Sequence, residues 1–138
     1  VHNYGRGARY ARQTLYAQYD MALHDKDPRQ LQPLDVWKKM ESATALGYVE
    51  NTQFPGQFGH LMGYQAGYYG YMWSEVLALD MLSAFGDNLN NPEVGQRYRQ
   101  TILSQGSQKK AAELVKDFLG RVPDNKAFLD EITGQRVK

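Results

Sequence analysis

The stretch from Phe58 to Phe85, FGHLMGYQAGYYGYMWSEVLALDMLSAF, limits the possible folds of this chain most strongly. From Tyr64 to Phe85 it has no proline and only two charged residues, Glu75 and Asp80. Gly86 follows, where a glycine commonly ends a helix. The pattern predicts one helix over 64–85, about 33 Å long. Because a helix that is apolar nearly all round is normally buried, we expect this helix to be the centre of the fold.

Tyrosines share one face of that predicted helix. Tyr64, Tyr68, Tyr71 and Glu75 follow the spacing i, i+4, i+7, i+11, which at about 100° per residue defines one narrow face. Spacing alone favours a buried aromatic face whose hydroxyls bond to internal partners, as is usual for tyrosine in a core. Tyr69 lies off this face and is expected in the core, and Glu75 is interpreted as a structural acceptor or ion-pair partner.

Glycines form a second stripe beside the tyrosines, at Gly63, Gly67 and Gly70. Each glycine inside a helix costs about 1 kcal/mol relative to alanine. The stripe therefore predicts the close approach of another backbone or of a ligand. His60 lies in the loop 58–63 before the helix, and a lone loop histidine is, on its own, more often an ordinary surface residue.

The rest of the chain also predicts helices, because apolar residues recur at helical spacing between runs of turn-forming residues. No run of alternating residues indicates a β-strand, so we expect an all-α fold. The predicted helices cover residues 8–24, 36–46, 92–103, 108–119 and 125–132, and their N-caps include Asp35, Asn91, Ser107 and Asp124.

Three polar side chains of these helices have specific expectations. Asp20 is expected on the surface of the helix 8–24, away from its apolar face. His24 lies in the last turn of that helix, where an imidazolium interacts favourably with the helix dipole. Asp80 is expected to pair with Arg97 or Arg99.

Composition excludes several classes of function. The 138 residues suit one domain, or a single segment 1–138 of a larger domain. A net charge of +1 gives no field that would attract nucleic acid or an anionic membrane, and the two acids of the helix 64–85 disfavour a membrane span. The chain has no cysteine, and none of its three histidines belongs to an HExxH motif. We therefore expect no metal ligands in this chain.

The residues FGHLMGYQAGYYGYMWSEVLALDM resemble the C-terminal catalytic-domain region of the thimet-type zinc metallopeptidases, the family of thimet oligopeptidase, neurolysin and oligopeptidase A. The resemblance extends to NPEVGQRYRQTILSQG and FLGRVPDNKAFL, and upstream to ARYARQ and YDMALH. It therefore covers most of the chain. One departure is that the family's paired glycine before the first tyrosine is a single Gly63 here.

The resemblance implies roles for five residues. Tyr71 matches the family's tyrosine that stabilises the oxyanion, and this match implies a catalytic role. Tyr64 and Tyr68 match tyrosines near the substrate backbone, and His60 matches a histidine that contacts the substrate. Gly63 belongs to the same substrate-binding loop, which we expect to move over bound peptide.

The resemblance also implies a cofactor and partners. The parent enzyme would use zinc, held by an HExxH helix upstream of this segment, and would hydrolyse short peptides. This segment alone would bind no zinc and would be inactive. Its partner would be the missing N-terminal part of the same protein, and without that part the apolar helix is expected to self-associate. No targeting segment is visible in this chain. The expected location is cytoplasmic. The alternative is a stand-alone, non-catalytic helical interaction module derived from the family.

Overall fold

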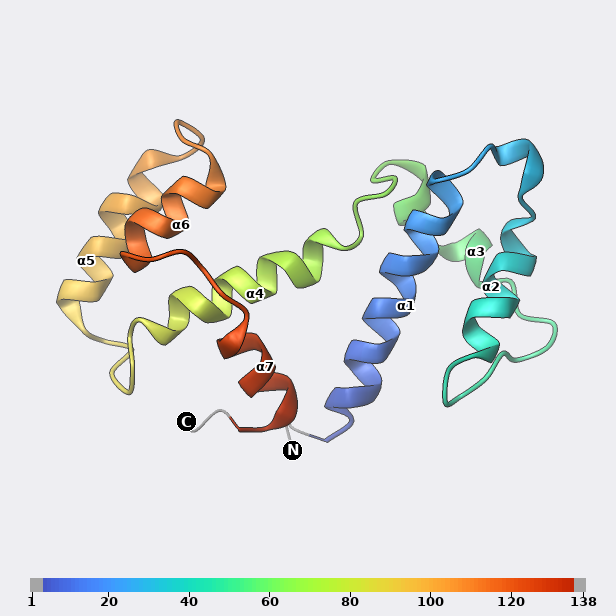
Figure 1. Ribbon diagram of the computed structural model, residues 1–138, viewed down its shortest axis with the longest axis horizontal. Helices are drawn as coiled ribbons and strands as arrows, with labels where there is room; N and C mark the ends of the chain where they lie inside the picture. The colour runs from blue at the N-terminus through green and yellow to red at the C-terminus, as the bar shows by residue number, and fades with distance from the viewer. Residues whose placement is uncertain (1–3, 136–138) are drawn as a thin grey trace. The chain divides into compact units, whose positions relative to one another are not determined.

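The computed structural model describes residues 4–135, and this part of the chain is helical without a β-strand (Figure 1). The all-α prediction is therefore confirmed. The α-helices are α1 (Arg6–His24), α2 (Pro33–Ser42), α3 (Phe54–Gln57), α4 (Gly70–Ser83), α5 (Pro92–Thr101), α6 (Ala111–Leu119) and α7 (Lys126–Thr133). Short 3-10 helices are η1 (Pro28–Gln30), η2 (Gly59–Met62) and η3 (Leu103–Gln105). In the described part, no helix is long and apolar enough to cross a membrane.

The chain divides into two compact units, residues 1–72 and 73–138. In the first unit, α1 packs against α2, and α3 lies beside α2 (Figure 1). The centre of its core is Trp37, which is fully buried and stacks on Phe54 with ring centroids 4.2 Å apart. Tyr19 is equally buried, and its hydroxyl donates to the Pro33 carbonyl at 3.0 Å. The core thus joins α1 to the segment that leads to the predicted site.

The predicted helix 64–85 is wrong at its beginning, because α4 begins only at Gly70. Residues 64–69 form turns, and Ala66 has a left-handed backbone with φ 55°. The backbone N–H groups of Ala66 and Tyr68 bond to the Asp20 carboxylate, so they are not available to carbonyls four residues earlier. Burial of α4 was also predicted wrongly, since Asp80 is its only buried residue.

The second unit is built around Phe118 of α6, which is 1% exposed. Tyr98 of α5 meets its ring edge-on at 5.6 Å, and the Arg97 guanidinium lies over it at 5.2 Å. Asp80 pairs with Arg121 rather than with Arg97 or Arg99, contrary to prediction. Arg97 is instead used in the contact with Phe118.

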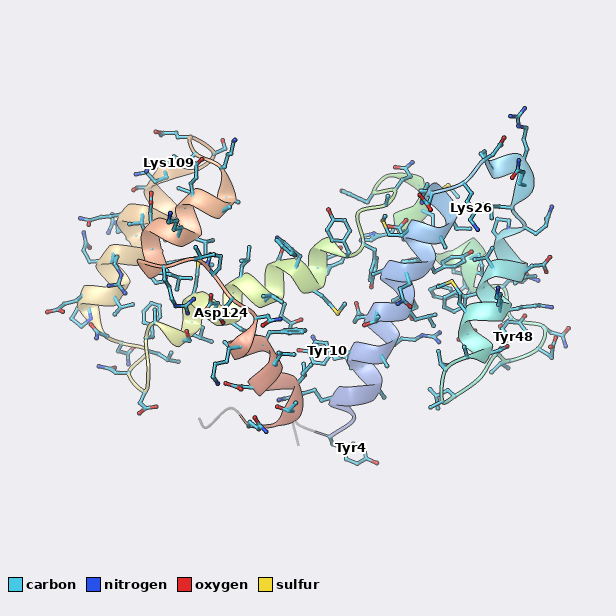
Figure 2. All side chains as sticks on the ribbon, viewed as in Figure 1. Tyr4, Tyr10, Lys26, Tyr48, Lys109 and Asp124 are labelled. Atoms are coloured by element: carbon cyan, nitrogen blue, oxygen red, sulfur yellow. The ribbon has the colours of Figure 1, made fainter. Side chains whose placement is uncertain are left out.

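Asp80 joins α4 to the segment between α6 and α7. Its carboxylate accepts hydrogen bonds from the Arg121 guanidinium and, at 2.9 Å, from the backbone N–H of Asp124. Figure 2 labels Asp124 on the segment that enters α7. The second unit therefore has a buried charge whose partners come from a segment about forty residues later in the chain.

Helix ends follow local chemistry, and some differ from prediction. Asn91 caps α5 as predicted, because its side chain accepts from the N–H groups of Glu93 and Val94. α2 begins at Pro33, a favoured first helical residue, so Asp35 lies inside the first turn instead of capping it. α6 begins at Ala111, so Ser107 is not its cap. Gly86 and Gly120 have the expected left-handed backbone after α4 and α6.

Candidate functional site

A turn-rich loop brings the four predicted aromatic residues together in the first unit. His60 lies on η2, Tyr64 and Tyr68 lie in the turns 63–69, and Tyr71 lies in the first turn of α4. The spacing argument placed the tyrosines on one continuous helix, and that part of the prediction is wrong. The residues meet because the chain folds back between η2 and α4.

His60 is the centre of this aromatic cluster, which we define as His60, Tyr64, Tyr68 and Tyr71. Its Nε2 lies 2.8 Å from the Tyr71 hydroxyl oxygen, and the two rings stack with an interplanar angle of 8°. Its ring meets Tyr68 edge-on at 5.1 Å and Tyr64 at a tilt, 5.2 Å away. Tyr68 and Tyr71 are also in ring contact, at 5.2 Å. All four side chains therefore form one aromatic surface.

The cluster has an open side and a packed side. Tyr64 and Tyr71 are 71% and 58% exposed. Tyr68 is half-buried, and its ring contacts Phe58 at 5.2 Å and Tyr16 of α1 at 5.6 Å. Phe58 and Tyr16 belong to the shell of the Trp37 core. The aromatic residues around Trp37 thus pack against one side of the cluster, while Tyr64 and Tyr71 remain accessible to a ligand.

The Tyr68 hydroxyl is held by α1. It donates to the Gln13 side-chain carbonyl oxygen at 2.9 Å. Burial raises the pKa of Tyr68, with a smaller opposing effect from the Gln13 bond. The side chain is therefore a neutral hydroxyl at physiological pH.

Asp20 holds the backbone of the same loop, and the sequence analysis missed it. The side chain is fully buried, and its two carboxylate oxygens accept from the N–H groups of Ala66 and Tyr68, each at 3.0 Å. The expected surface position of Asp20 is therefore wrong. One signal was present: Asp20 follows Tyr16 by four residues and precedes Leu23 by three, so it lies within the apolar face of α1.

His24 completes the surroundings of Asp20. Its Nδ1 lies 3.1 Å from an Asp20 carboxylate oxygen and 2.7 Å from the Asp20 backbone carbonyl oxygen. His24 therefore has a specific partner one turn earlier in the helix, in addition to the dipole that was expected to favour it.

Comparison with known proteins identifies the family of the chain. The sequence model of peptidase family M3 matches residues 1–134. The chain belongs to peptidase family M3. Among its relatives are saccharolysin of Saccharomyces cerevisiae, 37% identical over 88% of the chain, and oligopeptidase A of Escherichia coli, 34% identical over 93%. The thimet-like oligopeptidase of Dictyostelium discoideum is 33% identical over 89% of the chain.

The chain spans about a fifth of the length of these family M3 relatives: 18%, 20% and 19% of their sequences, respectively. The match to the family model confirms, at the level of the family, the resemblance to thimet-type peptidases drawn from FGHLMGYQAGYYGYMW. The matched region contains the whole aromatic cluster and both residues of α1 that hold Tyr68.

The glycines of this family M3 chain differ in their surroundings. A Cβ atom at Gly67 would lie 3.0 Å from the Tyr64 carbonyl oxygen, whereas at Gly63 or Gly70 it would meet nothing within 4 Å. The predicted approach of another backbone along the glycine stripe is therefore wrong: only Gly67 is crowded, and the crowding backbone belongs to its own loop. Gly63 lies in open space, directly after η2.

Tyr69 is not in the core, contrary to prediction. It is 54% exposed and lines an open groove with residues of α1, among them Ala17, Met21 and Ala22. Tyr69 lies in the turn that leads into α4.

The zinc expected for the parent enzyme does not fit the residues described. Within residues 4–135 no group of three or more His, Cys, Asp or Glu side chains could hold a metal ion. His60 contacts aromatic rings and a tyrosine hydroxyl, which do not form a zinc site. The chemistry that this part of the chain offers is hydrogen bonding by hydroxyls and imidazole on an aromatic surface.

Proposed function

We propose that this chain is the C-terminal part of a zinc-dependent oligopeptidase that hydrolyses short peptides, and that it supplies the substrate-binding loop and an oxyanion-stabilising tyrosine. The observation that carries the proposal is the 2.8 Å contact between His60 Nε2 and the Tyr71 hydroxyl on an accessible aromatic surface. Membership of family M3 supports the reaction class.

Tyr71 is the proposed catalytic residue. When His60 carries its proton on Nε2, it donates to the Tyr71 oxygen, and the Tyr71 hydrogen is free for another acceptor. Chains of hydrogen bonds polarise one another, so the bond from His60 makes Tyr71 a stronger donor. A hydroxyl held in this way can stabilise the negative charge that develops on the peptide carbonyl oxygen during hydrolysis.

His60, Gly63, Tyr64 and Tyr68 are the proposed substrate-binding residues. Tyr64 is the most exposed member of the cluster and can contact a peptide backbone directly. Tyr68 has donated its hydrogen to Gln13, so its oxygen remains as an acceptor for a peptide N–H. Gly63 gives the loop the freedom to adjust around a bound peptide.

Zinc is the proposed cofactor, because family M3 enzymes are zinc-dependent in general. Its ligands would come from the part of the relatives that lies outside the matched fifth of their length. That remaining part is the proposed partner of this chain. When bound, the zinc would supply Lewis-acid chemistry, while the residues here would bind and orient the peptide.

The proposal is tested by Tyr71→Phe in the zinc-loaded enzyme that contains this chain. The substitution keeps the aromatic ring and removes only the hydroxyl. Removing one oxyanion donor typically lowers kcat by about 10²–10³-fold. KM should stay nearly constant, because the bond forms mainly in the transition state.

Tyr69→Phe is the matched control, because Tyr69 is a half-exposed tyrosine two residues away that lines a groove with residues of α1. This variant should keep the kinetics of the wild type. Retention of more than about a third of wild-type kcat by Tyr71→Phe would lie far above the range for an oxyanion donor and would overturn the assignment.

A non-catalytic helical interaction module is the second candidate. The observation that favours it is the exposure of large apolar side chains around the cluster, including Met62 at 81%. The two candidates separate by zinc dependence. A module would bind a peptide with equal affinity in the presence and absence of zinc and would not cleave it, whereas the proposed enzyme cleaves it only with zinc.

The proposed location is cytoplasmic. Relatives carry names of more than one kind, such as the probable cytosolic oligopeptidase A and the organellar oligopeptidase A of Arabidopsis thaliana. Fractionation of cells that express the tagged natural gene tests this proposal, and recovery in a membrane-bounded organelle would contradict it.

A further inference from the structure

We infer that Gln13 and Asp20 of α1 are positioning residues for the aromatic cluster: together they fix Tyr68 and, through it, the direction of Tyr71. This inference rests on the proposed function for its catalytic consequence. That α1 fixes the loop does not depend on the proposed function, and it can be measured without an activity assay.

The Asp20 carboxylate is placed to fix the backbone at two points. Its two oxygens accept separately from Ala66 and Tyr68, so the carboxylate bridges both sides of Gly67. A fully buried carboxylate requires such partners, because a charge without them is strongly disfavoured inside a protein. The same bonds that satisfy Asp20 therefore define the shape of the loop.

The loop shape needs this support. Ala66 has φ 55°, a left-handed conformation that alanine rarely adopts. Such a conformation persists only where its surroundings enforce it. The Ala66 N–H donates to Asp20 at 3.0 Å, so the residue with this rare conformation is one of the two that Asp20 holds.

Gln13 holds the other end of Tyr68. It accepts from the Tyr68 hydroxyl at 2.9 Å, whereas Asp20 accepts from the Tyr68 backbone N–H at 3.0 Å. Gln13 and Asp20 are seven residues apart and therefore lie on one face of α1. One helix thus fixes Tyr68 at both its backbone and its hydroxyl.

The position of Tyr68 in turn limits the position of Tyr71. The Tyr71 backbone N–H donates to the Tyr68 carbonyl at 3.2 Å, and the two rings are in edge contact. Gly70 N–H likewise donates to the Gly67 carbonyl, so the first turn of α4 begins from the anchored loop. A shift of Tyr68 would therefore change the direction in which the Tyr71 hydroxyl points at His60 and at a substrate.

The first arm of the test uses the 138-residue chain and amide hydrogen exchange resolved by NMR. Asp20→Asn keeps the volume of the side chain but places an NH2 group against one of the two backbone donors. The Ala66 and Tyr68 amides should then exchange at least about tenfold faster, while amides in the middle of α2 keep their protection. Unchanged protection at both amides would overturn the inference.

The second arm uses the zinc-loaded enzyme. Misplacement of a reacting group by about 1 Å can cost roughly 10²-fold, so Asp20→Asn should lower kcat by about 10–100-fold with little change in KM. If Asp20 acts through Tyr71, the same substitution in a Tyr71→Phe background should cost less than about threefold. An equal loss in both backgrounds would indicate a general structural role and would overturn the inference.

Gln13→Ala provides a second variant if Asp20→Asn does not fold, because Gln13 is only half-buried. It should lower kcat by about three- to tenfold, again without further loss in the Tyr71→Phe background. Gln18→Ala is the matched control, since Gln18 is an exposed glutamine of the same helix. Equal kinetics of the Gln13 and Gln18 variants would contradict the role of Gln13.

The two proposals fail in different ways. If Tyr71→Phe lowers kcat but Asp20→Asn changes neither amide exchange nor kcat, the positioning inference falls and the proposed function stands. If Tyr71→Phe is harmless while the Ala66 and Tyr68 amides lose protection in Asp20→Asn, the proposed function falls and the hold of α1 on the loop remains established.

Discussion

Single residues decide the shape of the loop around the aromatic cluster. Gly67 lies between the two residues that bond to Asp20, and a Cβ atom there would lie 3.0 Å from the Tyr64 carbonyl oxygen. Such a contact is tighter than nine in ten real Cβ contacts, and the neighbour is a backbone atom that cannot rotate away. At Gly63 the corresponding space is open.

Gly67→Ala should therefore be more harmful than Gly63→Ala. We expect Gly67→Ala to lower kcat of the complete enzyme by roughly tenfold, because the loop must move away from Tyr64 and carries Tyr68 with it. Gly63→Ala should lower turnover less, through reduced flexibility alone. Steady-state kinetics of the two variants checks this order, and a larger loss for Gly63→Ala would contradict it.

At this scale the sequence was informative about which residues meet but not about how they meet. The resemblance selected His60, Tyr64, Tyr68 and Tyr71, and the structure brings these four together. Their functional roles stay predictions. The partners of Asp20 could not be assigned, because they lie 46 and 48 positions away and are backbone groups, which leave no pattern in a sequence.

Elements show where periodicity succeeds and where it fails. α1, α5 and α7 were predicted within two residues at each end, because their apolar stripes and end signals agree. α4 was predicted six residues too long at its beginning, because 64–69 has the composition of a helix. Two N–H groups of this segment donate to the Asp20 carboxylate of α1 instead of to helical carbonyls. Local periodicity does not reveal such a tertiary interaction.

Asp80 links α4 to the segment between α6 and α7, and it should make the stability of the second unit depend on pH. Burial alone would raise the pKa of Asp80, but the hydrogen bonds from Arg121 and Asp124 and the charge of Arg121 outweigh burial and lower it. A lowered pKa in the folded state stabilises the fold at pH values above the unfolded pKa, about 3.9. This contribution should be lost as the pH falls below about 4.

Asp80→Asn should remove this acid sensitivity and also destabilise the unit at neutral pH. We expect a loss of about 1–3 kcal/mol in the free energy of unfolding at pH 7, toward the lower end because Arg121 is 45% exposed. Amide exchange of α6 between pH 3 and 7 checks both effects. Asp130→Asn is the control, because its partner Lys126 is 77% exposed, and an equal effect of both variants would contradict the assignment.

Large apolar side chains remain exposed in both units and should favour association of the chain with itself. In the first unit these include Met62 at 81% and Tyr64 at 71%, and in the second Trp73 at 64% and Val122 at 70%. Exposed apolar patches commonly mark interaction surfaces. The 138-residue chain should therefore self-associate and bind a dye that reports apolar surface. Sedimentation of a clean monomer at high concentration without dye binding would contradict this prediction.

Metal content is a second prediction for the whole chain. Residues 4–135 contain no cluster of potential metal ligands, so the purified 138-residue chain should hold no stoichiometric zinc and should cleave no peptide. Elemental analysis after dialysis and a peptide cleavage assay check both statements. One equivalent of zinc retained per chain would contradict the assignment of the metal ligands to another part of the enzyme.

The central claim, that the Tyr71 hydroxyl meets the oxyanion of a peptide under hydrolysis, is tested most directly by a crystal structure of the zinc-loaded enzyme with a tetrahedral transition-state analogue of a short peptide. The quantity to measure is the distance from the Tyr71 hydroxyl oxygen to the analogue's tetrahedral oxygen. We predict a short hydrogen bond of about 2.5–2.8 Å, with His60 still in contact with Tyr71. A separation above about 4 Å, with the Tyr71 hydroxyl directed only at His60, would contradict the claim.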